Sequence, residues 1–148
     1  MSKQPDKPLW LSQFIEVYSQ LSVENVHHII DVYHEDIKFS DPAHQLSGMS
    51  QLLKYFDQLY SNVTECTFVI DEVFFQDKNA AVYWTMTYRH RRLNSHKPIT
   101  VTGHSKLVGE KDRVTHHKDY LDLGQMVYEH VPLIGLVIKN SKISYRHE

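Results

Sequence analysis

Three side chains suited to acid–base chemistry, His104, His117 and Asp119, fall within one predicted β-hairpin of residues 99–121. Its two arms are rich in Val, Ile, Thr and Tyr, and Gly109–Asp112 between them has the composition of a turn. If that turn closes symmetrically, His104 faces His117, and the period of two along a strand places all three side chains on one face. Burying two imidazoles and a carboxylate is unfavourable unless they have partners or a purpose. The hairpin therefore predicts a site.

This predicted cluster has three interpretations. It can be a structural network in which an imidazole and a carboxylate satisfy each other. It can be an acid–base or ligand-recognition site, because histidine exchanges protons near neutral pH. It can also be a metal site, since two histidines and one carboxylate form the ligand set of non-haem iron. No cysteine or second carboxylate supports that third interpretation, and we expect no metal.

The composition is that of a soluble globular chain. Its 148 residues fit one domain, which we place at 9–140 between polar tails at 1–8 and 141–148. The net charge of −2 gives no field that would attract nucleic acid, and the single Cys66 permits no internal disulfide, which suits a reducing cytoplasm. The longest apolar run, Val131–Ile138, is far shorter than the roughly 20 residues that span a bilayer. The sequence contains no phosphate loop or dinucleotide fingerprint, so we expect no cofactor.

The hydrophobic periodicity predicts an α+β fold. Helical spacing, strand composition and turn residues predict helices near 10–21, 22–33 and 47–60, a short strand at 37–40, long strands at 63–76, 80–92, 99–109 and 113–121, and a C-terminal helix at Gln125–Asn140. Three helices must then cover one face of the sheet, which we expect to be antiparallel and strongly curved. Such curvature leaves a cavity between sheet and helices, the usual place for a ligand.

Aromatic residues supply a candidate wall for that cavity. Trp84, Met86 and Tyr88 alternate along one predicted strand and share a face, which favours a flat or apolar ligand. Tyr18 and Tyr33 each lie on a predicted helical stripe and fit either core packing or a role in the pocket, because a buried hydroxyl needs a partner.

Several segments resemble the nuclear transport factor 2-like superfamily, and within it the SnoaL-like group. The resemblance is carried by the sequences at 32–42, 103–105 and 113–122. It implies a cone-shaped α+β roll with a deep pocket, lined by the face that bears the hairpin cluster. The superfamily contains isomerases, cyclases, hydrolases and non-catalytic binders, so the resemblance implies a fold more strongly than a reaction.

Comparison with ketosteroid isomerase, an enzyme of this superfamily, suggests further site residues. Asp41, just before Pro42, resembles its general base, although Asp-Pro is also common in bends. Tyr18 resembles its tyrosine donor. His104 stands where its protonated aspartic acid should be, which argues against steroid isomerisation. Polyketide cyclases of the SnoaL-like group are closer, because they pair an aspartate with a pocket histidine.

The sequence thus predicts a small-molecule pocket protein. It would be a cofactor-independent isomerase, cyclase or hydrolase acting on a hydrophobic substrate, or alternatively a non-catalytic ligand-binding or dimerisation domain. We also expect a homodimer through the outer face of the sheet. That expectation rests on Val101, Leu107, Val114 and Tyr120, which the symmetric hairpin would leave exposed in a monomer.

Overall fold

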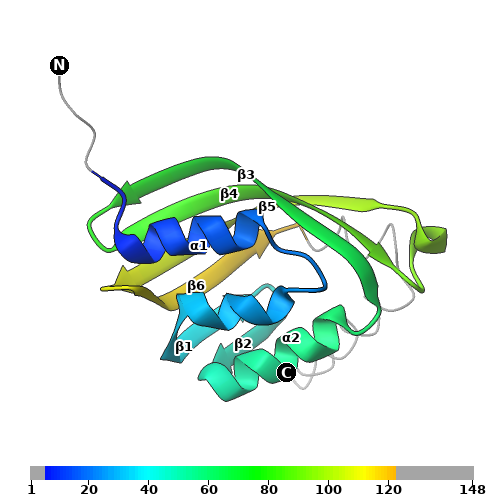
Figure 1. Ribbon diagram of the computed structural model, residues 1–148, viewed down its shortest axis with the longest axis horizontal. Helices are drawn as coiled ribbons and strands as arrows, with labels where there is room; N and C mark the ends of the chain where they lie inside the picture. Colours follow the sequence, from blue (N-terminus) through cyan, green and yellow to red (C-terminus); the bar gives the residue numbers. More distant parts are fainter. Residues whose placement is uncertain (1–5, 123–148) are drawn as a thin grey trace, which may run out of the picture.

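The computed structural model describes residues 6–122, and the helix predicted at Gln125–Asn140 lies outside the described residues. The fold is α+β, as predicted (Figure 1). In chain order the elements are α1 (Leu9–Ser19), the 3-10 helix η1 (Val26–Val32), β1 (Tyr33–Asp41), β2 (His44–Ser47), α2 (Met49–Tyr60), β3 (Val63–Gln76), β4 (Asn79–His90), the short 3-10 helix η2 (Asn94–His96), β5 (Ile99–Glu110) and β6 (Arg113–Leu121).

The six strands form one curved, unclosed sheet in the order β2-β1-β6-β5-β4-β3. All neighbours are antiparallel except β1 and β6, which run parallel. The predicted antiparallel sheet is therefore wrong at this pair, because the chain leaves β1, passes through β2, α2 and the strands β3 to β5, and returns beside β1 in the same direction. Strand β2 was not predicted. Its sequence, His-Gln-Leu-Ser, has one apolar residue, and it pairs with β1 only because the Pro42–Ala43 loop folds it back.

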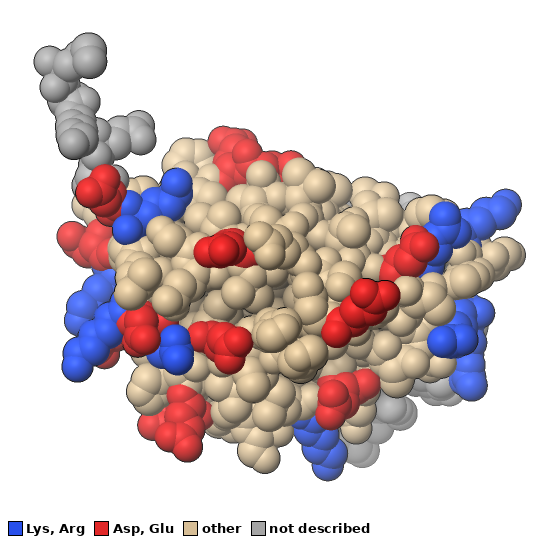
Figure 2. Space-filling model, in the orientation of Figure 1, with Lys and Arg blue, Asp and Glu red and all other residues tan. Residues whose placement is uncertain are grey.

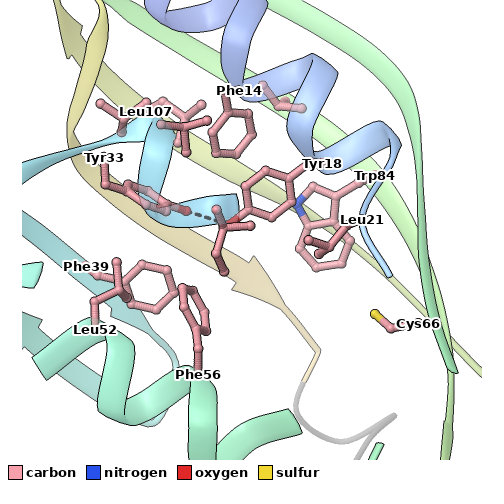
Figure 3. Packing of buried hydrophobic residues seen from close by; sticks show 14 of the residues in the cluster. Phe14, Tyr18, Leu21, Tyr33, Phe39, Leu52, Phe56, Cys66, Trp84 and Leu107 are labelled. Atoms are coloured by element: carbon pink, nitrogen blue, oxygen red, sulfur yellow. Dashed lines mark hydrogen bonds between the residues drawn. The ribbon is translucent and has the colours of Figure 1, made fainter. Parts of the chain in front are cut away.

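The helices cover one face of the sheet. Helix α1 packs on β3, β5 and β6, and α2 packs on β1, β2 and β3 (Figure 1). Trp10 and Phe14 lie one helical turn apart on α1 and are both buried, as the helical spacing predicts. Figure 3 shows Phe14 in the aromatic core with Phe39 from β1 and Phe56 from α2.

The predicted second helix is shorter than expected. Only Val26–Val32 is helical, in the 3-10 form, and Tyr33 begins strand β1 instead of ending a helix. Tyr33 pairs with Val114 of β6, so pairing in the sheet overrides the apolar stripe that includes Tyr33.

A β-bulge sets the register of the final hairpin. Its turn consists of Lys111 and Asp112, and Glu110 pairs with Arg113. Val108 then pairs with His116, while Gly109 pairs with Val114, so Thr115 is an extra residue in β6. The hydroxyl of Thr115 donates a hydrogen bond to the carbonyl of Val108 at 3.1 Å.

The bulge corrects the predicted register. Without it, the two-residue turn would pair His104 with Asp119 and keep the predicted cluster on one face. With it, His104 pairs with Tyr120 and Ser105 pairs with Asp119. His104 therefore lies on the outer face, stacked between Tyr83 and Tyr120 with ring centroids 4.7 Å from each. His117 and Asp119 stay on the inner face, so the prediction that all three share a face is wrong.

The same bulge places most of the apolar residues that were predicted on the outer face of the hairpin in the core instead. Val101, Leu107 and Val114 are buried in the core of the single chain, and only Tyr120 of the predicted set is exposed on the outer face. Other large apolar side chains on that face, Val69 and Phe74, are more than half exposed. The homodimer stays a prediction, but the three aliphatic residues cannot contribute to it.

Gly109 provides a test of the register. A Cβ at this position would overlap the indole ring of Trp10, which is itself buried. We expect Gly109→Ala to lower the free energy of unfolding by about 1–3 kcal/mol or more, because the core must shift to admit a methyl group. Urea denaturation measures the effect, with exposed Lys106→Ala on the same strand as the control. Equal midpoints for both variants would contradict this packing.

Candidate functional site

A cavity of about 470 Å³ lies between the inner face of the sheet and the helices. Its wall is mostly aromatic and apolar, and includes Tyr18, Phe39, Phe68, Trp84 and Met86. This size is typical of small-molecule sites, which combine apolar walls with a few convergent polar groups. In this cavity those polar groups come from the strands of the inner face and from both α-helices.

Asp119 of β6 is held by two donors on the same carboxylate oxygen. Ser105 Oγ donates to Asp119 Oδ1 at 2.6 Å, and His117 Nε2 lies 2.6 Å from the same atom. Ser105 accepts in turn from Trp84 Nε1 at 2.9 Å. Ser105 and His117 are each 2 % exposed, so both are fixed by packing.

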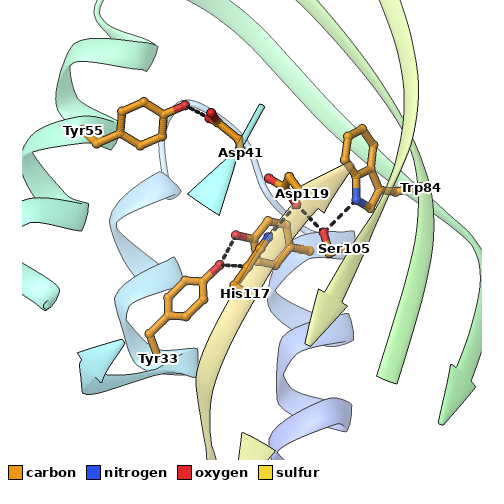
Figure 4. A network of polar contacts seen from close by, with 8 residues as sticks. Tyr33, Asp41, Tyr55, Trp84, Ser105, His117 and Asp119 are labelled. Carbon is orange, nitrogen blue, oxygen red and sulfur yellow. Dashed lines mark hydrogen bonds and ion pairs between the residues drawn. The ribbon is translucent and has the colours of Figure 1, made fainter. Parts of the chain in front are cut away.

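A line of hydrogen bonds continues from His117 to helix α1. His117 Nδ1 lies 2.8 Å from the hydroxyl of Tyr33, and that hydroxyl lies 2.5 Å from the hydroxyl of Tyr18 (Figure 4). Phe14 and Phe39 enclose the imidazole, with ring centroids 5.7 Å and 4.6 Å away. Burial raises the pKa of both tyrosines well above the ordinary value, so both remain protonated hydroxyl groups.

Donor counting fixes the direction of this line. When His117 is neutral and Asp119 is ionised, Nε2–H donates to Asp119, Tyr33 donates to Nδ1, and Tyr18 donates to Tyr33. Tyr18 lines the cavity, so its hydroxyl oxygen is the acceptor that this line presents to a ligand.

Asp41 occupies a second polar position, where β1 turns into β2. Its Oδ1 accepts from the Ala43 N–H at 2.8 Å and from His44 Nδ1 at 3.0 Å, and its Oδ2 accepts from the Tyr55 hydroxyl. Burial raises the pKa of the Asp41 carboxyl, but the hydrogen bonds from His44, Tyr55 and Ala43 together outweigh burial and hold that pKa below its ordinary value. Asp41 is therefore a stable carboxylate and a weak base.

The two carboxylates leave neighbouring strands on the same face. Ser40 of β1 pairs with Lys118 of β6 in the parallel register, and Asp41 and Asp119 are the next residues on each strand. Both line the cavity. They differ in their second oxygens: Asp41 Oδ2 is occupied by Tyr55, whereas Asp119 Oδ2 has no hydrogen-bond partner among residues 6–122. Asp119 is thus the carboxylate with an available oxygen.

The structure brings together most of the residues that the sequence singled out. Tyr18, Asp41, Trp84, Met86, Tyr88, His117 and Asp119 all line the cavity, and Tyr33 lies behind it as the link between Tyr18 and His117. His104 is the exception, on the outer face. Sequence reasoning missed Ser105, His44, Tyr55 and His90. Ser105 follows His104 directly, so a register that allowed for a bulge would have found it.

The described residues offer no cluster for a metal ion. The separation of His104 from His117 removes the predicted alternative of a metal triad. Residues 6–122 contain no group of three or more His, Cys, Asp or Glu side chains placed to hold a metal. None of the described helices has the length and apolar character required to cross a membrane.

The architecture defines an α+β class of protein in which helices and a curved mixed sheet enclose a small-molecule-sized cavity. Residues 12–117 match the SnoaL-like domain family, and the chain belongs to that family. The resemblance seen in the sequence is thereby confirmed. Among curated proteins, no sequence matches this chain.

Solved structures share the fold at low sequence identity. A protein of Jannaschia sp. CCS1 assigned as a SnoaL-like polyketide cyclase superposes with a TM-score of 0.73 and 12 % identity, over 87 % of this chain and 98 % of its own. A protein of Catenulispora acidiphila with a ketosteroid isomerase-like fold, crystallised with trimethylamine, gives 0.68 and 11 %, over 88 % and 98 %. TerC, co-crystallised with polyporic acid, gives 0.70 and 11 %, over 81 % and 96 %. At these identities the likeness shows the fold alone.

The tyrosine line provides a stability test. Tyr33→Phe removes the central hydroxyl and leaves both His117 Nδ1 and the Tyr18 hydroxyl without their partner. Each buried unsatisfied group costs about 1–3 kcal/mol, so we expect the free energy of unfolding to fall by about 2 kcal/mol or more. The double variant Tyr18→Phe, Tyr33→Phe should lose less than the sum of the single losses, because the orphaned Tyr18 hydroxyl is gone. Exposed Tyr83→Phe is the control, and strict additivity in urea denaturation would contradict the coupling.

The lowered pKa of Asp41 predicts a pH dependence of stability. Between the folded and unfolded pKa values of this carboxyl, the unfolded chain binds more protons. The stability that the Asp41 carboxylate contributes is therefore fully present above the pKa of this group in the unfolded chain. It is lost as the pH falls through the lower pKa of the folded protein, below about pH 4. Asp41→Asn should be less stable at pH 7 and show a flatter decline below about pH 4 in thermal melts. Asp57→Asn, on an exposed part of α2, controls for net charge, and parallel curves for wild type and Asp41→Asn would refute the assignment.

Proposed function

We propose that this protein binds a flat, largely apolar small molecule in its cavity and that Asp119 removes a proton from it without a cofactor. The observation that carries the proposal is the asymmetry of the Asp119 carboxylate. Its Oδ1 is held by Ser105 and His117, and its Oδ2 lacks a protein partner among the described residues in a wall that is mostly apolar. A carboxylate fixed in this way is positioned to act as a base, because its orientation is set by two donors and its second oxygen faces the cavity where a substrate would lie.

The remaining polar residues have supporting roles in this proposal. Ser105 and His117 orient Asp119. Tyr18, at the cavity wall, presents its hydroxyl oxygen to a donor group on the substrate, by the donor order described above. Asp41 keeps both oxygens occupied by His44, Ala43 and Tyr55 and is a structural carboxylate instead of the base that the resemblance to ketosteroid isomerase implied. His104 has no role at the cavity.

Membership of the SnoaL-like family supports an isomerase or cyclase of this kind, in which a base first removes a proton from carbon. In a hydrolase the same carboxylate would take the proton from an attacking water. The surface supports a small molecule over nucleic acid. On the face shown in Figure 2, Lys and Arg side chains gather toward the ends of the molecule with Asp and Glu across the middle, and no continuous basic track crosses this face.

Non-catalytic binding is the second candidate function. It is favoured by the continuity of the hydrogen bonds from Tyr18 to Trp84, which are satisfied without a ligand and would give a rigid binding wall. In that case Asp119 serves as a polar anchor for the ligand and takes no proton.

Proton removal can be tested with 5-nitrobenzisoxazole, a flat aromatic carbon acid. A base takes the proton on carbon 3, the ring N–O bond breaks, and a coloured cyanophenolate forms. We expect the protein to accelerate this reaction and Asp119→Asn to lower the rate by about 10²-fold or more, the usual contribution of a positioned base. Asp41→Asn should retain more of the rate than Asp119→Asn.

Two measurements separate the candidates. Calorimetry with 5-nitroindazole, a flat analogue whose ring N–H can donate to Asp119 Oδ2, shows whether Asp119→Asn still binds, and Tyr83→Phe on the outer face is the matched control for rate. A wild-type rate no greater than that of acetate buffer, together with an affinity for 5-nitroindazole that is weakened by about 1–3 kcal/mol in Asp119→Asn, would favour the non-catalytic binder over the enzyme. Equal rates for wild type and Asp119→Asn would exclude Asp119 as the base.

A further inference from the structure

The cavity contains a second polar end, formed by Tyr88 of β4. Tyr88 lines the cavity and is only 5 % exposed, yet its hydroxyl has no hydrogen-bond partner among the described residues. A buried hydroxyl without a partner is unfavourable by about 1–3 kcal/mol, and native structures keep few such groups unless something fills the space. The network around Asp119 does not use Tyr88.

His90 supplies a second donor beside it. His90 lies two residues further along β4, on the same face, lines the cavity and is 5 % exposed. Its Nδ1 accepts the backbone N–H of Arg92 at 3.1 Å. An Nδ1 that accepts carries no hydrogen, so a neutral His90 has its hydrogen on Nε2 and can donate it.

Both groups are uncharged at neutral pH. Burial raises the pKa of Tyr88 to about 12, so its hydroxyl stays protonated. Burial and the charge of Arg92 lower the pKa of His90, so its imidazole stays neutral. The nearby Cys66, which pairs with Tyr88 across β3 and β4, also stays a thiol because burial raises its pKa to about 11. This end of the cavity therefore offers hydrogen-bond donors without positive charge.

This donor end is remote from Asp119. Val82 of β4 pairs with Ser105, and Ser105 pairs with Asp119, so Asp119 lies level with Val82 across the sheet. Tyr88 is six residues beyond Val82, about 20 Å of extended strand before the curvature of the sheet is considered. Figure 3 shows Cys66, the cross-strand partner of Tyr88, on the far side of Trp84 from Tyr33.

We propose that Tyr88 and His90 form a subsite for a neutral oxygen acceptor, such as a ketone or quinone carbonyl, at the end of an elongated ligand. The proposal rests on the proposed function in that the same cavity takes a small molecule. A carboxylate or phosphate is disfavoured there, since Lys54, the one Lys or Arg side chain among the described residues of the wall, is exposed and belongs to α2.

The test uses a pair of probes that differ in one carbonyl group. The ketone 6-propionyl-2-dimethylaminonaphthalene is fluorescent, and its emission shifts to the red when its carbonyl accepts a hydrogen bond. The matched compound, 6-propyl-2-dimethylaminonaphthalene, lacks the oxygen. We expect Tyr88→Phe to weaken binding of the ketone by about 3- to 10-fold, the range for one lost hydrogen bond, and to shift the bound emission to the blue. Binding of the propyl compound should be unchanged or tighter, because the variant has no orphaned hydroxyl.

Tyr83→Phe, which removes a hydroxyl from the outer face, is the control and should change neither affinity. Equal effects of Tyr88→Phe on both probes, or no effect on either, would overturn the subsite while leaving Asp119 and the cavity as a ligand site. Failure of the wild-type protein to bind either probe would overturn the proposed ligand cavity as well. Binding needs no turnover, so loss of nitrobenzisoxazole chemistry alone does not affect this test.

Discussion

The structure depends on one extra residue in β6. Thr115 bulges out of the ladder and is held by its hydrogen bond to the Val108 carbonyl. Because side chains alternate with period two, the bulge exchanges the two faces of β5 relative to β6. It sends Ser105 inward beside Asp119 and His104 outward between two tyrosines. Gly109, next to the bulge, lets the indole of Trp10 approach the strand, so helix α1 and the register of the sheet support each other.

With that register in place, the buried polar groups satisfy one another. His117 is 2 % exposed and is surrounded by aromatic rings, a position where an unpaired imidazole would be costly. Tyr33 and Asp119 occupy its two nitrogens. The resulting line from Tyr18 to Trp84 crosses the inner face and links α1 to the four strands β1, β6, β5 and β4, so that the position of Asp119 is set by groups that are themselves buried.

Two aspartates at equivalent places on neighbouring strands have different environments. Asp41 lies in the β1–β2 turn, where three donors occupy both oxygens and stabilise the carboxylate. Asp119 lies in mid-sheet and keeps one oxygen for the cavity. The difference in available oxygens between these two aspartates thus follows from their local hydrogen bonds and not from the residue type. The fold of the family is compatible with either aspartate as the reactive one. The neutral donors at Tyr88 and His90 complete a cavity with one acidic end and one donor end.

The sequence by itself determined the fold class, the two main helices and the four long strands, because the 3.6- and 2-residue periods are local properties that survive in the folded chain. It also placed Trp84, Met86 and Tyr88 on one face and selected His117 and Asp119, since an imidazole and a carboxylate are unusual in mid-strand. Asp41 was selected only through the resemblance to ketosteroid isomerase. Only the tertiary structure decided the parallel pairing of β1 with β6, the short β2, the strand position of Tyr33 and the outward face of His104. Those features depend on which distant strands pair and on a bulge that leaves no distinct trace in composition. A one-residue change in register moves every later side chain to the opposite face of the sheet. The residues of the site therefore could not be assigned from the alternating pattern alone, without the strand pairing.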